Sequence, residues 1–350
     1  MKFDFKDICL VPSKISRITS REQVNTRTVR NYLPIMAAPM DTVVNIDNAN
    51  EYVLNGIMPC LPRLGEGVSP RFNNDSMFVS MSLDDFSFFL DEYESFKGHS
   101  GVIKILVDVA NGHMKHLQGI IQKFINLRRE FGKINDHQIM VGNIANPETY
   151  EEYAKMGVDY VRVGIGGGSG CLTSANTGVH YPMASLIAEC YVLKVENGYQ
   201  SRIVADGGFK NYDDIIKALA LGADFVMLGG IFNQCIESCG DTKLFKHIPI
   251  PLHIAKDLWY RVPFLRNYMY KSFRGMSTKE VQKSWGKTFL KTSEGIVKTN
   301  KINYSLPQWV ENFESYLKSA MSYTDSYTLE DFKKSDYVFI TQNALNRFNK

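Results

Sequence analysis

Short apolar runs alternate with helix-length amphipathic segments along the first two thirds of the chain. Eight such runs have the length and apolar content of buried parallel strands. They occupy residues 34–40, 57–63, 78–83, 102–110, 138–144, 160–166, 202–208 and 225–230. Strands and helices alternating in this order predict an α/β fold, a (β/α)8 TIM barrel. The main alternative is a doubly wound sheet, which usually carries G-x-G-x-x-G after its first strand, and no such loop follows residues 34–40.

Roughly a third of the chain follows the eighth run. Residues 241–271 are rich in Pro, Tyr, Trp and basic groups and predict an excursion from the barrel, whereas residues 271–300 predict a mobile flap over its mouth. Helices containing Trp309, Phe313 and Leu329 are expected to close the barrel as a C-terminal extension. No repeat or linker interrupts the sequence, so residues 1–350 are predicted to form a single domain.

Charge and cysteine usage narrow the function classes. The 40 basic and 37 acidic residues give a formal net charge of +3, and no polybasic run indicates a nucleic-acid or membrane partner. No apolar run reaches the about 18 residues of a membrane-spanning helix, and the first residues do not resemble a signal peptide. The six cysteines form no C-x-x-C pair, which favours reduced cysteines in a cytoplasmic protein.

In a barrel, functional groups lie at the C-terminal ends of the strands. The loop from residue 164 to residue 174, GIGGGSGCLTS, starts at the end of the sixth run and has five glycines in its first seven residues. Glycines let a backbone approach a ligand closely. A thiolate on Cys171 could attack an electrophilic carbon, and Thr173 could hold a water or leaving group. The alternatives are a small buried cysteine and a turn threonine.

Two Gly-Gly pairs follow the last two predicted strands. Gly207-Gly208 and Gly229-Gly230 stand where barrels often bind phosphate on backbone N–H groups. Asp206 precedes the first pair and would then face ribose hydroxyls, unless it only caps a turn or helix. Together with Cys171, these loops predict covalent catalysis on a phosphorylated small molecule.

A fourth polar segment, DVANGH, follows the fourth run. Asp108 and Asn111 could orient a ring or a second substrate at the barrel mouth. His113 and His116 have no obvious carboxylate partner, so they predict no metal site. We expect both to be solvated surface histidines.

The same segments carry a resemblance to a known family. In order they are residues 5–12 (FKDICLVP), 38–43 (APMDTV), 108–112 (DVANG), the cysteine loop, 206–208 (DGG), 225–230 (FVMLGG), 274–277 (RGMS) and 293–295 (SEG). This set resembles the inosine monophosphate dehydrogenase / guanosine monophosphate reductase family over nearly the whole chain. It is most similar to the reductase branch.

The resemblance implies a reaction. Cys171 would attack C2 of the purine and form a covalent thioimidate, with Thr173 and Glu294 managing the protons of the departing ammonia. NADPH would then reduce C2, so that guanosine monophosphate (GMP) becomes inosine monophosphate (IMP). The family also implies a homotetramer and a purine mononucleotide as the partner.

The resemblance also assigns binding residues. The phosphate would lie against Ser169, Gly207, Gly208, Gly229 and Gly230, the ribose against Asp206, and the purine against Gly275, Met276, Ser277 and Gly295. The nicotinamide cofactor would contact Arg63, Asp108, Val109, Ala110 and Gly166. A monovalent cation such as potassium would be held by the backbone carbonyls of Gly166, Gly168 and Cys171.

Three features favour a reductase over a dehydrogenase that oxidises IMP to xanthosine monophosphate with NAD. Only residues 64–77 separate the second and third runs, so there is no room for the CBS modules usual in dehydrogenases. Between Thr278 and Glu294 there is neither the Arg nor the Tyr with which dehydrogenases activate water. The wording of residues 108–112 also matches the reductase. A flavin-dependent barrel and a non-catalytic nucleotide-binding protein are further alternatives.

The chain departs from the family pattern at several positions. Ser174 stands where the family has a basic residue, and Leu172 where it has threonine. Pro62 precedes Arg63 where histidine is usual, and residues 38–40 are closer to the dehydrogenase. These changes suggest a divergent branch, whose substrate could be a modified purine nucleotide and whose hydride donor could be NADH.

Overall fold

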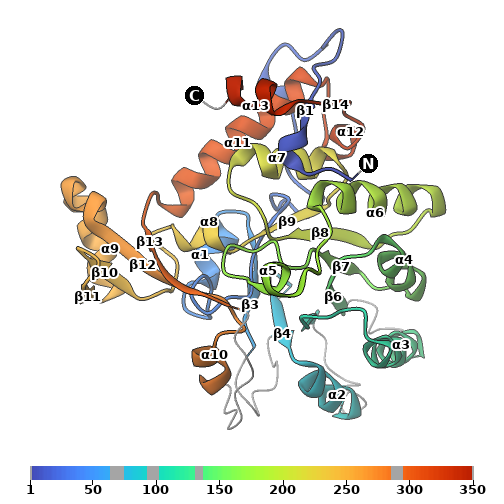
Figure 1. The fold of residues 1–350 in the computed structure, drawn as a ribbon, viewed down its shortest axis with the longest axis horizontal. Helices are drawn as coiled ribbons and strands as arrows, with labels where there is room; N and C mark the ends of the chain where they lie inside the picture. The colour runs from blue at the N-terminus through green and yellow to red at the C-terminus, as the bar shows by residue number, and fades with distance from the viewer. Residues whose placement is uncertain (1, 64–74, 93–101, 131–136, 285–294, 349–350) are drawn as a thin grey trace.

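A computed structural model of the protein describes residues 2–63, 75–92, 102–130, 137–284 and 295–348. Its centre is a closed barrel of eight parallel strands, each hydrogen-bonded to its neighbours in chain order (Figure 1). The strands are β2 (Ile35–Ala37), β3 (Met58–Leu61), β4 (Phe78–Met81), β5 (Lys104–Asp108), β6 (Gln138–Ile144), β7 (Tyr160–Val163), β8 (Arg202–Asp206) and β9 (Phe225–Leu228). Each lies within a predicted run, and the predicted (β/α)8 barrel is confirmed.

Helices cover the outside of the barrel. They are α1 (Ala49–Leu54), α2 (Leu83–Glu92), α3 (Lys115–Glu130), α4 (Pro147–Met156), α6 (Met183–Asn197), α7 (Tyr212–Ala220) and α11 (Leu306–Tyr323). Local chemistry sets their ends: the Asn146 side chain accepts hydrogen bonds from the first turn of α4, and Gly157 ends that helix with φ of 95°. Two short helices, α5 (Thr173–Thr177) and α8 (Gly230–Asn233), follow strands at the barrel mouth.

Strand alternation divides the core into two layers. Successive side chains of a strand point to opposite sides, so every second residue faces the barrel axis. The inner cluster consists of Met36, Ala38, Met58, Cys60, Phe78, Leu106, Met140, Tyr160, Val204, Phe225 and Met227. On β5, Lys104, Leu106 and Asp108 share the inward side. The apolar middle of the barrel therefore has a lysine at the strand start and a carboxylate at the strand end.

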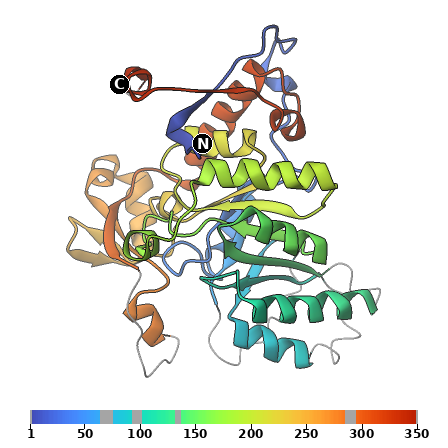
Figure 2. The ribbon, with the colours of Figure 1, turned by 45° about the vertical axis from the view of Figure 1, so that its right-hand side comes forward.

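The segment after α8 contains regular structure that the sequence did not predict. Residues 242–301 contribute a four-stranded antiparallel sheet, in the order β11 (Ile248–Ile250), β10 (Thr242–Leu244), β12 (Met269–Arg274) and β13 (Val297–Lys301). This sheet and α9 (Leu252–Arg261) project from one side of the barrel (Figures 1 and 2). The segment between β12 and β13 includes α10 (Lys279–Ser284), and part of it lies outside the described residues.

Asn233 of α8 joins this sheet to the barrel. It is fully buried, and its Nδ2 donates to the carbonyls of Thr42, at 2.9 Å, and Ser272, at 2.8 Å. Its Oδ1 accepts from Asn300 Nδ2 of β13 at 2.8 Å. Because one side chain satisfies groups from the β2 loop, β12 and β13, the sheet is held at a defined place on the barrel mouth.

The two ends of the chain meet on the outside of the barrel. β1 (Ile8–Leu10) pairs antiparallel with β14 (Tyr337–Phe339), a strand within the C-terminal extension that we expected to be helical. The extension also contains α11, α12 (Leu329–Phe332) and α13 (Gln342–Phe348). Trp309 and Phe313 of α11 are buried, and Trp309 stacks on Tyr212 of α7 at 5.7 Å between ring centroids.

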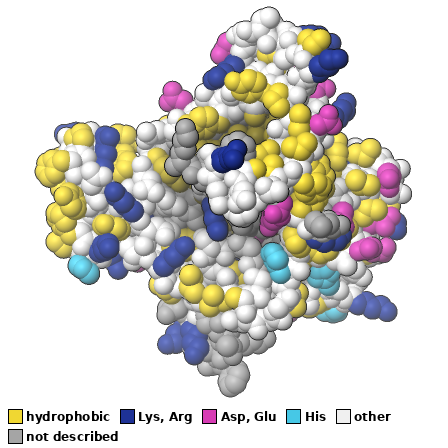
Figure 3. Space-filling view, turned by 45° about the horizontal axis from the view of Figure 1, so that its top comes forward, with side chains coloured by type: hydrophobic (Ala, Val, Ile, Leu, Met, Phe, Trp, Pro, Cys, Tyr) yellow, Lys and Arg dark blue, Asp and Glu magenta, His cyan; other side chains and the backbone are white. Residues whose placement is uncertain are grey.

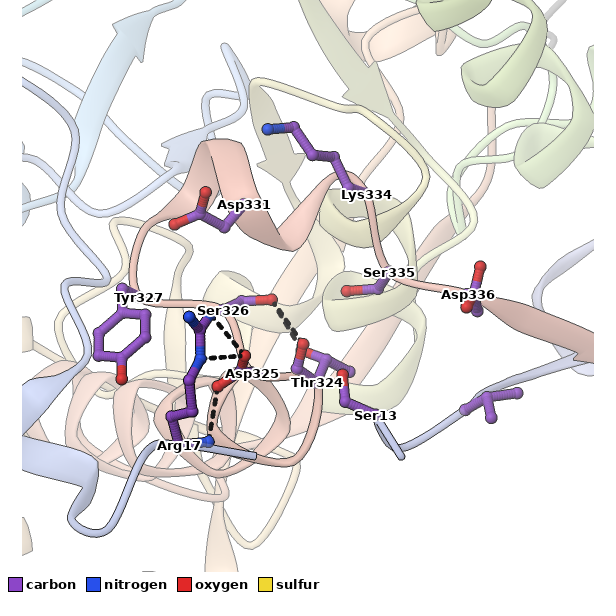
Figure 4. A pocket seen from close by; sticks show the side chains of 11 residues that line it. Ser13, Arg17, Thr324, Asp325, Ser326, Tyr327, Asp331, Lys334, Ser335 and Asp336 are labelled. Carbon is purple, nitrogen blue, oxygen red and sulfur yellow. Dashed lines mark hydrogen bonds and ion pairs between the residues drawn. The ribbon is translucent and has the colours of Figure 1, made fainter. Parts of the chain in front are cut away.

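A small polar pocket of about 290 Å³ lies between the N-terminal and C-terminal segments, away from the barrel mouth (Figure 4). Arg17 and Asp325 form an ion pair in its wall, with Nη2 at 2.8 Å from Oδ2, and this pair joins the two segments. On the face shown in Figure 3, Lys and Arg side chains are scattered rather than joined into one tract. Among the described residues, no helix is both long and apolar enough to cross a bilayer.

Candidate active site at the barrel mouth

The cysteine loop connects β7 to α5. Cys171 is half-buried, and its N–H donates to the Gly168 carbonyl at 2.9 Å. Its thiol donates to Thr173 Oγ1 at 3.2 Å. The tight turn between Gly168 and Cys171 therefore presents a thiol and a hydroxyl side by side, which is the arrangement that a nucleophile and a proton-handling group require.

The ends of β12 and β13 lie against this loop. Cys171 forms an antiparallel bridge with Gly295, and the Ile296 N–H donates to the Gly170 carbonyl at 3.1 Å. A Cβ placed on Gly275 would come within 2.4 Å of the Gly170 oxygen, so this contact requires glycine.

The purine-binding residues predicted on this segment gather next to the cysteine. A Cβ on Gly295 would lie 3.1 Å from Ser277 Oγ and 3.3 Å from Gly275 Cα. Met276 lies between Gly275 and Ser277 and is half-buried. Glu294, the predicted proton-handling partner of Thr173, lies outside the described residues.

The three loops predicted to hold phosphate converge. Gly207 and Gly208 have φ of 93° and 88°, and a Cβ on Gly207 would lie 2.9 Å from the Gly168 nitrogen. A Cβ on Gly230 would lie 2.5 Å from Ser169 Oγ. Ser169, Gly207, Gly208 and Gly230 thus surround one region. A Cβ on Gly229 would instead come within 2.6 Å of Met40 Sδ, so its lack of a side chain makes room for the β2 loop.

A buried arginine connects the two carboxylates at the mouth. Arg162 of β7 is 8% exposed, and its Nε and Nη2 both lie 3.0 Å from Asp206 Oδ2. Its Nη1 donates to Asp108 Oδ1 at 2.7 Å. Asn143 Nδ2 also donates to Asp206 Oδ2, at 2.8 Å, and Arg63 Nη2 donates to the Asp108 carbonyl at 2.5 Å. These contacts form a network across the mouth, in which Arg162 and Asn143 both bind Oδ2 of Asp206.

The charges of this network keep Arg162 protonated despite its burial. Burial alone would lower the pKa of Arg162, but the adjacent Asp206 and Asp108 carboxylates raise it above its ordinary value. Breaking a buried ion pair by removing one member usually costs more than the pair contributes, because the remaining charge has no partner. Arg162 lies in the middle of an apolar run and therefore did not stand out in the sequence. Strand periodicity puts it on the same side of β7 as Tyr160, which belongs to the inner cluster.

The residues predicted for the cofactor differ in their placement. Arg63 and Asp108 meet at the mouth, with Arg63 Nε 3.6 Å from Asp108 Oδ2, and Ala110 is exposed there. Val109 is 8% exposed and packs into the outer core, and its backbone pairs with Gly142 and Asn143. Its side chain therefore packs in the outer core and does not face the mouth.

Two of the carbonyls predicted to hold a cation accept internal hydrogen bonds. The Gly166 oxygen accepts from Ser174 Oγ at 2.9 Å, and the Gly168 oxygen from the Cys171 N–H. Each carbonyl retains a second lone pair, so these hydrogen bonds leave both oxygens able to accept a further partner. Ser174, where the family has a basic residue, holds the loop through this bond.

His113 is not the solvated histidine that we expected. It is half-buried, its Nδ1 lies 2.9 Å from Thr149 Oγ1, and its Nε2 accepts from the Ala145 N–H at 3.0 Å. Burial lowers its pKa, so the ring is a neutral link between the segment before α3 and the start of α4. His116 is exposed, as expected. In the described part of the chain, no cluster of His, Cys, Asp and Glu is arranged to hold a metal ion.

Another pair joins two segments of the family resemblance. Arg274, at the end of β12, binds Asp41 in the β2 loop, with Nε at 3.1 and 3.0 Å from the two carboxylate oxygens. Its Nη2 lies 2.5 Å from Oδ2. This bidentate ion pair positions β12 and the adjoining Gly275 over the mouth.

Fold and site together define a parallel β/α barrel with a half-buried cysteine beside converging glycine loops at its mouth. A family profile described as "IMP dehydrogenase / GMP reductase domain" matches residues 96–249. A GMP reductase of Onchocerca volvulus is 30% identical over 99% of this chain and 93% of its own length.

Two further relatives cover nearly the whole chain. GMP reductase 2 of Mus musculus is 27% identical over 98% of this chain and 96% of its own length. A GMP reductase of Vibrio vulnificus is 29% identical over 100% and 98%. The chain belongs to the IMP dehydrogenase / GMP reductase family, which confirms the resemblance and makes the protein a purine nucleotide oxidoreductase.

Proposed function

We propose that the protein is a GMP reductase, which converts GMP to IMP and ammonia with NADPH as the reductant. The observation that carries the proposal is the Cys171 thiol beside the Thr173 hydroxyl, at the point where the glycine loops and the Gly275–Gly295 contact meet. The full-length relatives named GMP reductase support it.

The nucleotide is placed by groups at three strand ends. Its phosphate lies against Ser169, Gly207, Gly208 and Gly230, with Gly229 making room for the adjoining loop. Its ribose hydroxyls face Asp206, whose Oδ2 is held by Arg162 and Asn143. The purine then extends toward Gly275, Met276, Ser277 and Gly295, which brings C2 to Cys171.

The chemistry begins at sulfur. The Cys171 thiolate adds to C2, the bond from C2 to the exocyclic nitrogen breaks, and ammonia departs with a proton supplied through Thr173 and Glu294. Arg63, Asp108, Ala110 and Gly166 would hold NADPH, which would supply the hydride that reduces C2. The C2–S bond then breaks, its electron pair returns to Cys171 as thiolate, and IMP leaves.

Other properties belong to the same proposal. The Gly166, Gly168 and Cys171 carbonyls share a potassium ion, residues 271–300 act as a flap whose two ends belong to β12 and β13, and residues 1–350 form one domain. The protein works as a homotetramer in the cytoplasm, where its six free cysteines stay reduced. NADH as donor, or a modified purine nucleotide as substrate, would be variants of the same reaction.

The test follows two products at once. Purified protein is incubated with GMP and NADPH in potassium and in sodium buffer, and NADPH oxidation and ammonia release are measured. We expect equal amounts of both, faster with potassium, and loss of at least a thousandfold in Cys171→Ala. Cys9→Ala, the same substitution in a half-buried cysteine away from the mouth, should keep the activity.

Two outcomes would contradict the proposal. NADPH oxidation without ammonia would indicate a different acceptor. Turnover of IMP with NAD, and none of GMP, would identify a dehydrogenase in which another group replaces the missing Arg and Tyr.

A further inference from the structure

A cavity of about 960 Å³ lies at the opposite end of the barrel from Cys171. Its floor includes Met58, Tyr160, Arg202 and Phe225, which are the first residues of β3, β7, β8 and β9. In a parallel barrel, strand starts and strand ends lie on opposite faces, so this basal cavity is separate from the mouth. Its walls come from residues 25–34, the end of α6 and α12.

The floor of the basal cavity is apolar and aromatic. Met58, Tyr160 and Phe225 are 2%, 3% and 4% exposed, and the two rings lie 6.0 Å apart between centroids. Tyr32 packs against the same inner cluster from the wall. The volume lies near the upper end of the range of about 300–1,000 Å³ typical of small-molecule sites. The exposed parts of these rings are small and lie at the bottom of the cavity, where an aromatic group could contact them.

Positive charge exceeds negative charge around this floor. Arg30 and Lys104 share one carboxylate, Asp75, at 2.5 and 3.2 Å. Arg202 is exposed, with its guanidinium 5.0 Å from the centroid of the Tyr160 ring, and no carboxylate of the described residues pairs with it. Among the described residues, the carboxylate of Asp75 is therefore the single ion-pair partner for these three cations.

The other charges of the cavity compensate one another. Asp224 accepts from both Lys194 and Lys333 at 2.6 Å, and Lys333 also pairs with Glu330 at 2.8 Å. Arg27 pairs with Glu314 at 2.9 Å. Within the described part of the chain, the excess of about two positive charges thus belongs to Arg30, Lys104 and Arg202.

The positive charges of Arg30 and Arg202 affect the pKa values of two neighbouring groups. Burial raises the pKa of the Tyr160 phenol, and the Arg202 and Arg30 charges oppose that rise. Burial lowers the pKa of Lys104, and the same two arginines lower it further. Both guanidinium groups therefore act on the same corner of the floor, where an added anion would relieve their repulsion.

We propose that the basal cavity is a second, non-catalytic site that binds a nucleotide. Its phosphate lies between Arg30 and Arg202, and its base lies against the aromatic floor beside Tyr160. A phosphate monoester carries about −1.5 to −2 charges at neutral pH, which matches the local excess. Arginine forks suit phosphate oxygens, and the ring surface provides the aromatic contact. The inference is independent of the proposed reaction, because no residue of the mouth takes part.

The experiment titrates AMP into the whole protein by calorimetry. We expect saturable binding in wild-type protein and in Asp206→Asn, which alters only the mouth. The Kd should rise at least tenfold in Arg202→Gln and in Arg30→Gln. Arg261→Gln, the same change at an exposed arginine of α9, should leave the Kd unchanged. Because Arg30 and Arg202 are both exposed, these variants should keep the native melting temperature.

Adenosine and inorganic phosphate serve as half-ligands. We expect each to bind at least tenfold more weakly than AMP. The proposal is overturned if AMP does not bind, or if Asp206→Asn abolishes binding while Arg202→Gln keeps it. Inorganic phosphate that binds as tightly as AMP would overturn the aromatic contact and leave only an anion site.

Discussion

Arg162 is the residue on which the charged groups at the barrel mouth depend. Its guanidinium contacts both Asp206, which we place at the ribose, and Asp108, which we place at the cofactor. A single side chain thereby fixes the orientation of a carboxylate in each of two binding regions. Arg162 acts through these carboxylates and is a positioning residue.

Replacing Arg162 tests this role. Arg162→Met leaves two buried carboxylates without their partner and should lower the free energy of unfolding by about 3–5 kcal/mol. Arg162→Lys keeps the charge but cannot bridge both carboxylates, so KM for both GMP and NADPH should rise while the protein stays folded. Denaturant unfolding and initial rates measure the two effects. A Lys variant with unchanged KM values would show that the bridge does not position the carboxylates.

Individual site residues could be predicted from the sequence where their neighbours along the chain are distinctive. Cys171 stood out because glycines surround it, and Asp206 because a Gly-Gly pair follows it. Arg162 did not, because its flanking valines read as an ordinary strand. Its role depends on which strands adjoin β7, and that register exists only once the barrel closes. His113 was misjudged for a similar reason, since its partners Thr149 and Ala145 belong to the next βα unit.

Among the elements, β12 and β13 deliver the proposed purine-binding residues to the cysteine loop. Their ends are tied by the Gly275 N–H, which donates to the Ile296 carbonyl at 3.0 Å, and by the pair between Arg274 and Asp41. Because Gly275 closely contacts the Gly170 carbonyl, we expect this contact to set how near the purine base comes to Cys171.

Enlarging Gly275 should separate the two elements. In Gly275→Ala the new methyl would meet backbone atoms of Gly170 and Gly295, so we expect kcat/KM for GMP to fall at least tenfold. Gly119→Ala is the matched control: no atom lies within 4 Å of its added Cβ, and alanine is the better helix former, so activity should persist. Equal activity in both variants would mean that the contact does not matter for catalysis.

The barrel strands were predictable, whereas the projecting sheet was not. Each barrel strand is a nearly continuous buried apolar run, the pattern expected when both faces of a strand are covered. β10 and β11 have three residues each, β11 contains Pro249, and β13 reads VKTNK. Such short, partly exposed strands are set by pairing with distant segments rather than by their own composition.

For the whole molecule, a buried lysine within the projecting sheet makes the free energy of unfolding depend on pH. Lys271 of β12 is fully buried, and its Nζ donates to the Ser238 carbonyl at 2.5 Å. Burial lowers its pKa to about 8 from its ordinary value of 10.5. Between these two pH values the unfolded chain binds more protons than the folded one, so this lysine makes stability rise with pH.

Lys271→Met should remove that dependence. The wild-type protein should gain stability relative to the variant as pH rises from 8 to 10.5, by on the order of 3 kcal/mol over the window. Taking the difference between the two proteins cancels the opposite contributions of buried tyrosines and cysteines, which both share. The measurement is denaturant unfolding at a series of pH values. A constant difference across the window would show that Lys271 keeps its ordinary pKa in the folded protein.

The two ends of the barrel divide the chemistry of the molecule. At the mouth, the inward-facing side chains are Asp108 and Asp206, joined by Arg162. At the base, the inward-facing side chains are Lys104, Tyr160 and Arg202. The apolar middle separates them, so a ligand at one end would act on the other only through the strands between.

The central claim is that Cys171 bonds to the purine, and the intact mass of the protein tests it most directly. The protein is incubated with GMP and oxidised NADP, which has no hydride to give, and then denatured in acid. We expect a mass gain of one GMP less ammonia in wild-type protein and in Cys9→Ala, and none in Cys171→Ala. An adduct that persists in Cys171→Ala, or its absence from wild-type protein that releases ammonia, would contradict covalent catalysis at this cysteine.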